Sequence, residues 1–188
     1  GLEPFAGEVE GLFPVLMDIQ PGALTWQAVL DLLSNARRRA DLEGKYEDAV
    51  ARCYAAIEKA AHRVLQQSYG IDAGHVDPAK VPEPLRPRLQ ARRRLHRRKD
   101  GTTIEIISIG LRDQYELLAA LGDPLGLRFT EMSDSLARHL DARNRSILAH
   151  GFVPARREHY ENLFHDALQL LNIPEQDLTA FPVLNLEA

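Results

Sequence analysis

An arginine and a histidine in the last third of the chain have the types and the spacing to act together on a phosphate. Arg143 and His150 are seven residues apart. On a helix this spacing brings two side chains back to nearly the same direction, about 20° apart and roughly 10 Å further along the axis. A guanidinium matches phosphate oxygens with a planar fork, and an imidazole exchanges protons near neutral pH. The reaction that needs only these two groups is cleavage of RNA by its own 2′-hydroxyl.

The residues between them are also suited to holding a phosphate. Asn144, Arg145 and Ser146 follow Arg143 directly, and Asp141 is the one acidic residue close by. Arg145 and Ser146 are therefore candidate substrate-binding residues. The competing interpretation is structural: Arg143 pairs with an acid elsewhere, and His150 is a satisfied residue at a helix C-terminus.

A helix must position this motif. Ser133 is a candidate N-cap, and the apolar stripe runs through Leu136, Leu140 and Ile147. Helical steps from that stripe place positions 143 and 150 on the same face, and Gly151 predicts the end of the helix just after His150. Charged groups on a face that should be buried are costly in a monomer core, so we expect this face to meet a second copy of the chain across a wet cleft.

Three strings of the sequence carry a family resemblance. They are Arg143-Asn-Arg-Ser-Ile-Leu-Ala-His-Gly-Phe152, Asn35-Ala-Arg-Arg-Arg-Ala-Asp-Leu-Glu-Gly-Lys-Tyr-Glu-Asp-Ala49 and Leu118-Leu-Ala-Ala-Leu-Gly-Asp-Pro-Leu-Gly126. The first resembles the R-N…H signature of HEPN ribonucleases. Together, in this order, they resemble the C-terminal HEPN domain of the CRISPR-associated (type III) CARF–HEPN proteins, over roughly residues 25 to 170.

The resemblance implies a homodimer whose two motifs meet at the interface and cut single-stranded RNA, with Arg143, Asn144 and His150 as catalytic residues. The commonest HEPN spacing leaves four residues between Arg and His, which Arg145 fits, whereas Arg143 leaves six. Arg145 therefore remains an alternative catalytic arginine. In the full-length relatives a CARF domain ahead of the HEPN domain senses cyclic oligoadenylate and controls the cut.

Composition limits the other classes of function. The chain has 188 residues and a formal net charge of −4, so RNA binding must be local rather than driven by a global positive field. The single Cys53 excludes an internal disulfide and a thiolate zinc site, and it suits the cytoplasm. The histidines show no metal-ligand spacing, no apolar run is long enough for a membrane span, and we expect neither metal nor cofactor.

The remaining pattern predicts an all-α, HEPN-like helical bundle of about five main helices. Thr25 caps one helix that Gly44 ends, a second runs from Tyr46 to near Gly70, and the two form an antiparallel hairpin. Further helices are predicted from Leu111 to Leu121 and from Arg156 to Leu171. We expect Gly122 to Gly126 to be a turn.

Residues 1–24 are expected to be a linker or arm from a missing sensor domain, with Phe13, Val15 and Leu16 as docking points. Residues 25–188 are expected to be the HEPN domain.

Two segments depart from the helical pattern. Residues 86–99 hold eight Lys or Arg, and we expect this segment to lie outside the core, either as a solvated segment or as a phosphate-binding patch. Residues 102–109 are β-branched and predict a small β-hairpin or edge strand that pairs with a loop segment or with a second copy. Arg37, Arg38 and Arg39 are interpreted as a solvated face, and Glu158, His159, His165 and Asp166 as ordinary helix-surface residues.

Two other functions remain open. The first is a non-catalytic HEPN-type module for dimerisation or RNA binding, in which Arg143 and His150 only hold structure. The second is a helical nucleotide-binding domain, which tight ATP binding without RNA cleavage would favour. No Gly-rich phosphate loop follows a strand, and no acid completes a Ser-His triad with Ser146.

Overall fold

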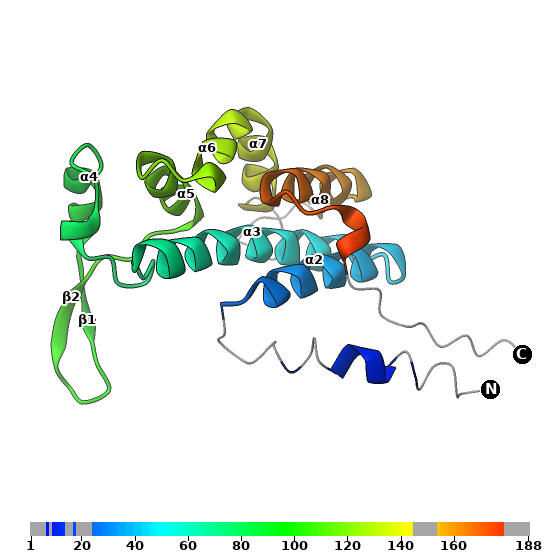
Figure 1. Cartoon of the computed structure of the whole chain (residues 1–188), viewed down its shortest axis with the longest axis horizontal. Helices are drawn as coiled ribbons and strands as arrows, with labels where there is room; N and C mark the ends of the chain where they lie inside the picture. The colour runs from blue at the N-terminus through cyan, green and yellow to red at the C-terminus, as the bar shows by residue number, and fades with distance from the viewer. Residues whose placement is uncertain (1–6, 8, 14–16, 18–23, 145–153, 179–188) are drawn as a thin grey trace, which may run out of the picture.

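The computed structural model describes residues 7, 9–13, 17, 24–144 and 154–178, with the backbone alone for residues 141–144. Within these residues the protein is mostly helical, with one small antiparallel hairpin, which confirms the predicted fold class (Figure 1). None of the helices described is both long enough and apolar enough to span a membrane.

Two antiparallel helices, α2 (Trp26–Asp41) and α3 (Tyr46–Tyr69), form the base of the bundle. Thr25 caps α2 as predicted, because its side chain accepts a hydrogen bond from the Ala28 amide at 3.1 Å. Gly70 ends α3 in the left-handed conformation at φ 61°, which an L side chain rarely adopts. The predicted hairpin of helices is confirmed.

The helix α3 lies at the centre of the bundle. It contacts α2 on one side and α5 (Leu111–Ala120), α7 (Ser133–Asn144) and α8 (Arg157–Leu171) on the other (Figure 1). Its buried stripe includes Val50, Cys53 and Ile57. Tyr115 of α5 is fully buried against α3, and its hydroxyl donates to the Ile57 carbonyl at 2.9 Å. This bond satisfies the one polar atom of a large core side chain.

The predicted turn at Gly122 to Gly126 is shorter than expected. Only Leu121, Gly122 and Asp123 connect α5 to α6 (Pro124–Glu131), with Asp123 as the N-cap of α6. Proline is favoured in the first turn of a helix because it has no N–H to leave unpaired, so Pro124 starts α6 rather than preventing it. The predicted bounds of α3, α5 and α8 agree to within a residue, whereas α2 ends at Asp41 rather than beside Gly44. Helix α7 begins at Ser133 itself rather than after it, and its predicted end beside Gly151 lies outside the described residues.

The basic segment contributes both a core residue and a strand. Helix α4 (Arg86–Gln90) buries Leu89, which is 1% exposed, so the expectation that 86–99 lies wholly outside the core was wrong at this residue. Beyond α4, β1 (Arg94–Arg97) pairs antiparallel with β2 (Thr103–Ile106), Arg94 opposite Ile106 and Arg97 opposite Thr103. The β-branched segment therefore pairs with the basic segment of its own chain.

The remaining described segments are short. Two 3-10 turns, Pro78–Lys80 and Glu175–Asp177, flank the bundle, and Leu178 packs into the core as expected for the start of the tail. Phe13 is 57% exposed and does not dock, whereas Val15 and Leu16 lie outside the described residues.

Candidate functional site

The helix α7 carries the first two residues of the predicted motif. Leu136 and Leu140 are buried, as the stripe predicts. Arg143 and Asn144 are the last two residues of α7, where the structure describes the backbone alone. Arg145, Ser146 and His150 lie outside the described residues, as does Ile147. The structure thus gives the motif a helical start, and the meeting of Arg143 with His150 stays a prediction.

A buried carboxylate on α8 holds α7 in place. Asp166 is 7% exposed, and its Oδ2 lies 2.6 Å from Oγ of Ser135 and 2.7 Å from Nδ1 of His139. A carboxylate can only accept here, so the contact places a proton on Nδ1 of His139. The interpretation of Asp166 as an ordinary surface residue was wrong, because its partners come from another helix. His165 is exposed as expected, whereas His159 is half-buried and its Nδ1 accepts from the Arg156 amide at 3.4 Å.

This cluster was not predicted, although two of its three residues show a recognisable spacing in the sequence. Ser135 and His139 are four residues apart, which puts both side chains on one face of α7. Their common acceptor, Asp166, is 27 residues beyond His139 and could be assigned only once α8 was placed against α7. The cluster lies one to two turns before Arg143, so it fixes the helix from which the motif continues.

The string from Leu118 to Gly126 forms the place where α5 and α6 cross closely, and α6 leads into α7. A Cβ added at Gly126 would lie 2.2 Å from the backbone nitrogen of Ala119 and 2.5 Å from the carbonyl carbon of Leu118, so only glycine fits there. Asp123 accepts from the Leu125 amide at 2.8 Å and from the Tyr69 hydroxyl at 3.0 Å. Burial and this hydrogen bond to Asp123 raise the pKa of Tyr69. The string therefore sets how α5, α6 and α3 meet.

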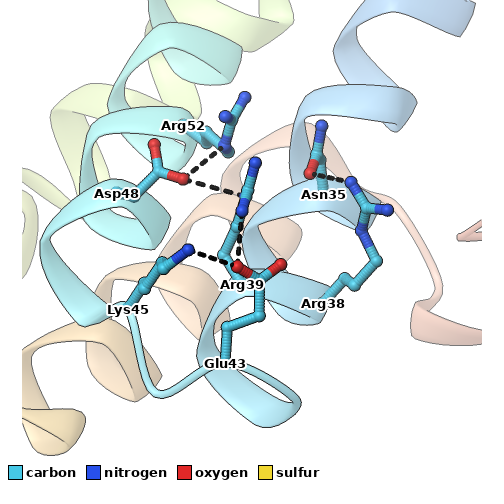
Figure 2. A network of polar contacts seen from close by, with 7 residues as sticks. All are labelled: Asn35, Arg38, Arg39, Glu43, Lys45, Asp48 and Arg52. Atoms are coloured by element: carbon cyan, nitrogen blue, oxygen red, sulfur yellow. Dashed lines mark hydrogen bonds and ion pairs between the residues drawn. The ribbon is translucent and has the colours of Figure 1, made fainter.

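The string from Asn35 to Ala49 forms a polar network at the turn between α2 and α3, shown in Figure 2. Arg39 lies 2.5 Å from Glu43 and 3.1 Å from Asp48. Lys45 also binds Glu43 at 2.7 Å. The interpretation of Arg37 to Arg39 as a solvated face was wrong for Arg39, whose side chain is only 28% exposed and joins the two helices.

One cavity of about 260 Å³ lies between α2 and α8, beside the last 3-10 turn. Its polar lining is Arg37, Asp41, Tyr160, Glu161, His165 and Glu175. Burial raises the pKa of Tyr160, so its hydroxyl is protonated at neutral pH. The lining carries both signs of charge, which gives it no selectivity for an anion.

The described residues contain no group of three or more His, Cys, Asp or Glu placed to hold a metal ion. The one cysteine, Cys53, is buried, and burial raises the pKa of its thiol, so it is not a reactive thiolate.

Comparison with known proteins gives one match. A sequence model of the family described as the Csm6 HEPN domain matches residues 24–174, which include all three strings singled out above. No curated protein and no solved structure matches the chain.

Proposed function

Since the chain belongs to the Csm6 HEPN domain family, a type III CRISPR-associated HEPN family, we propose that it is an endoribonuclease that cuts single-stranded RNA without a metal. The observation that carries the proposal is the position of the Arg143–His150 motif within the matched residues, with Arg143 and Asn144 at the end of a helix anchored on the bundle. The motif lies within the residues that the family model matches.

The reaction follows from the two side chains. His150 removes the proton from a ribose 2′-hydroxyl, and the 2′-oxygen attacks the adjacent phosphorus. The bond from phosphorus to the 5′-oxygen breaks, and that oxygen takes up a proton. The products are a 2′,3′-cyclic phosphate and a 5′-hydroxyl. Arg143 stabilises the negative charge on the equatorial oxygens of the pentacoordinate transition state, with Asn144 beside it.

The proposal includes a homodimer. One histidine and one arginine make a sparse site, and pairing the same face of a second chain doubles the groups around one cleft. Arg145 and Ser146 then hold the phosphates on either side of the cut. In the full-length protein, a CARF domain that binds cyclic oligoadenylate controls the reaction, as in the CARF–HEPN relatives that the sequence resembles.

The test is cleavage of a single-stranded RNA in EDTA by the chain and by His150→Ala, with and without cyclic oligoadenylate for the full-length protein. We expect cleavage by the unchanged protein, no cleavage of the same strand carrying a 2′-deoxy nucleotide at the cut, and loss of activity in His150→Ala. RNA binding without cleavage under all of these conditions would instead support the non-catalytic module, and cleavage that survives the 2′-deoxy substitution would exclude the mechanism.

A further inference from the structure

The hairpin of β1 and β2 extends from the bundle and is strongly basic. The hairpin lies near the C-terminal end of α3, at the end of the molecule away from α8 (Figure 1). Its base is fixed by two backbone hydrogen bonds, from Val76 to Ile107 at 2.8 Å and from Ile109 to Ala73 at 2.9 Å. Every residue from 91 to 103 is exposed. A strand rises about 3.3 Å per residue, so the tip stands well beyond the helices.

The positive charges of the hairpin divide into a paired base and an unpaired tip. At the base, Arg92 binds Asp113, Arg93 lies 3.3 Å from Glu105, and Arg94 donates to Oγ of Ser108 at 2.6 Å. Toward the tip, Arg97, Arg98 and Lys99 have no hydrogen bond or ion pair from their side chains to any residue that the structure describes. The tip thus carries a cluster of three adjacent positive charges, followed by one acid, Asp100, which accepts hydrogen bonds from Thr102.

Folding gives no reason for that cluster. Three adjacent cations without partners add nothing to stability, and the chain as a whole carries a net charge of −4. Charges that protect an exposed strand edge from pairing lie on the strand itself, whereas Arg98 and Lys99 lie in the turn beyond β1. The cluster is explained if its ligand is a polyanion.

We propose that the tip of this hairpin, Arg97, Arg98 and Lys99, binds the phosphate backbone of single-stranded RNA outside the cleavage site. Residues 92–106 contain no Phe, Tyr or Trp on which a base could stack. The contact is therefore electrostatic and independent of RNA sequence. The inference deepens the proposed ribonuclease function and rests on it for the identity of the ligand.

The place of the hairpin gives it a role in capturing long substrates. It lies beside the C-terminal end of α3, whereas α7 and α8 pack further along the bundle (Figure 1). A strand of about 30 nucleotides can contact both places, and one of about 5 cannot, since a single-strand site typically covers 4–16 nucleotides. The tip therefore lowers the KM for long RNA and leaves kcat and the cleavage of short RNA unchanged.

The experiment measures binding separately from cleavage. Arg97→Ser/Arg98→Ser is compared with Lys45→Ser/Lys59→Ser, which also removes two positive charges, one from the N-cap of α3 and one from near the middle of that helix. The ligand is a 2′-O-methyl RNA of about 30 nucleotides, which lacks the attacking hydroxyl, and affinity is followed by fluorescence anisotropy over a salt series. Thermal unfolding checks that both variants are folded.

Counterion release sets the expected result. Two phosphate contacts to a single strand contribute about 1.4 to the slope of log affinity against log salt, so losing both weakens binding about tenfold near 0.15 M salt. We expect this loss in the hairpin variant, little change in the control, and recovery in Arg97→Lys/Arg98→Lys. Equal affinities for the hairpin variant and the control would overturn the inference.

The two proposals fail in distinguishable ways. If the unchanged protein cleaves RNA but the hairpin variant binds and cuts long RNA as the control does, the hairpin inference is wrong and the ribonuclease stands. If no cleavage occurs but the hairpin variant alone loses affinity, the hairpin inference stands as an RNA-binding site without the ribonuclease. A hairpin variant that binds RNA normally but fails to bind an acidic protein partner would also overturn it.

Discussion

The carboxylate of Asp166 on α8 lies 2.7 Å from Nδ1 of His139 on α7, and the same oxygen accepts from Ser135. One buried acid therefore joins the helix that carries the motif to the last helix of the bundle. A buried acceptor that serves two donors on a neighbouring helix fixes both the rotation and the height of that helix. In the proposed enzyme this contact fixes the position of the helical backbone at Arg143.

Replacing Asp166 by alanine should destabilise the fold. Ser135 and His139 would lose their acceptor in a partly buried place, which costs about 1–3 kcal/mol. The control is His165→Ala, the exposed neighbour on the same helix, which we expect to change stability by less than about 0.5 kcal/mol. Urea unfolding measures both. Equal midpoints for the two variants would show that the cluster contributes nothing to stability.

Replacing Gly126 by alanine tests the crossing of α5 and α6. The new Cβ would overlap the backbone of Ala119 and Leu118, and backbone atoms cannot rotate aside as a flexible side chain can. We expect a loss of about 1–3 kcal/mol or more. At Gly110, where an added Cβ has nothing within 4 Å, alanine should change stability by about 1 kcal/mol at most. A Gly126→Ala protein as stable as the Gly110→Ala protein would contradict the crossing.

The arginine at the turn between α2 and α3 should not be replaceable by lysine. Arg39 reaches both Glu43 and Asp48, and a single ammonium cannot reproduce a guanidinium that contacts two acids. We expect Arg39→Ala to cost about 1–2 kcal/mol and Arg39→Lys to recover only part of it. Thermal unfolding at low and high salt measures this. Full recovery by lysine would mean that charge alone is needed.

The same network gives a pH dependence with a definite sign. Hydrogen bonds from Lys45 and then Arg39 hold the pKa of Glu43 below its usual value of 4.5. A carboxyl with a depressed pKa in the folded state contributes stability at neutral pH, and that contribution is lost as the pH falls below about 4.5, through the folded-state pKa. An NMR titration of the Glu43 carboxyl should show this pKa, and Lys45→Ala should raise it. A pKa unchanged by Lys45→Ala would remove Lys45 as its main cause.

Sequence reasoning recovered elements whose ends are marked by local chemistry. Thr25 and Gly70 act within a turn of their own positions, so the bounds of α2 and α3 could be read from the chain. Elements that depend on contacts with residues distant in the sequence were not predicted. Helix α6 was missed because Gly126 looks like a helix breaker until the close approach of α5 explains it, and β1 because its charged residues show no apolar alternation.

The motif shows the same division. The types and spacing of Arg143 and His150 were visible in the sequence, and the burial of Leu136 and Leu140 confirms the phase of the helix before them. The anchor of that helix at Asp166 was not visible, because it depends on the packing of α8. The meeting of the motif residues stays a prediction, since all but the first two lie outside the described residues.

Helix geometry favours Arg143 over Arg145 as the arginine that acts with His150. Position 143 is seven residues after Leu136 and seven before His150, so on a continuous helix all three share one direction to within about 20° per step. Position 145 is five residues from His150, about 140° round the helix. A regular helix therefore places only position 143 on the face of His150, whereas an unwound segment before Gly151 would favour the four-residue spacing of Arg145.

Single alanine variants decide between the two arginines. We expect Arg143→Ala to lower kcat on single-stranded RNA by a factor of at least about 100, the loss typical of removing one group that stabilises the transition state. Arg145→Ala should raise KM and leave most of kcat, because its proposed role is to hold substrate. Light scattering and thermal unfolding ensure that both variants are folded and dimeric. If Arg145→Ala abolishes cleavage while Arg143→Ala retains it, the assignment is reversed, and the helix must unwind before His150.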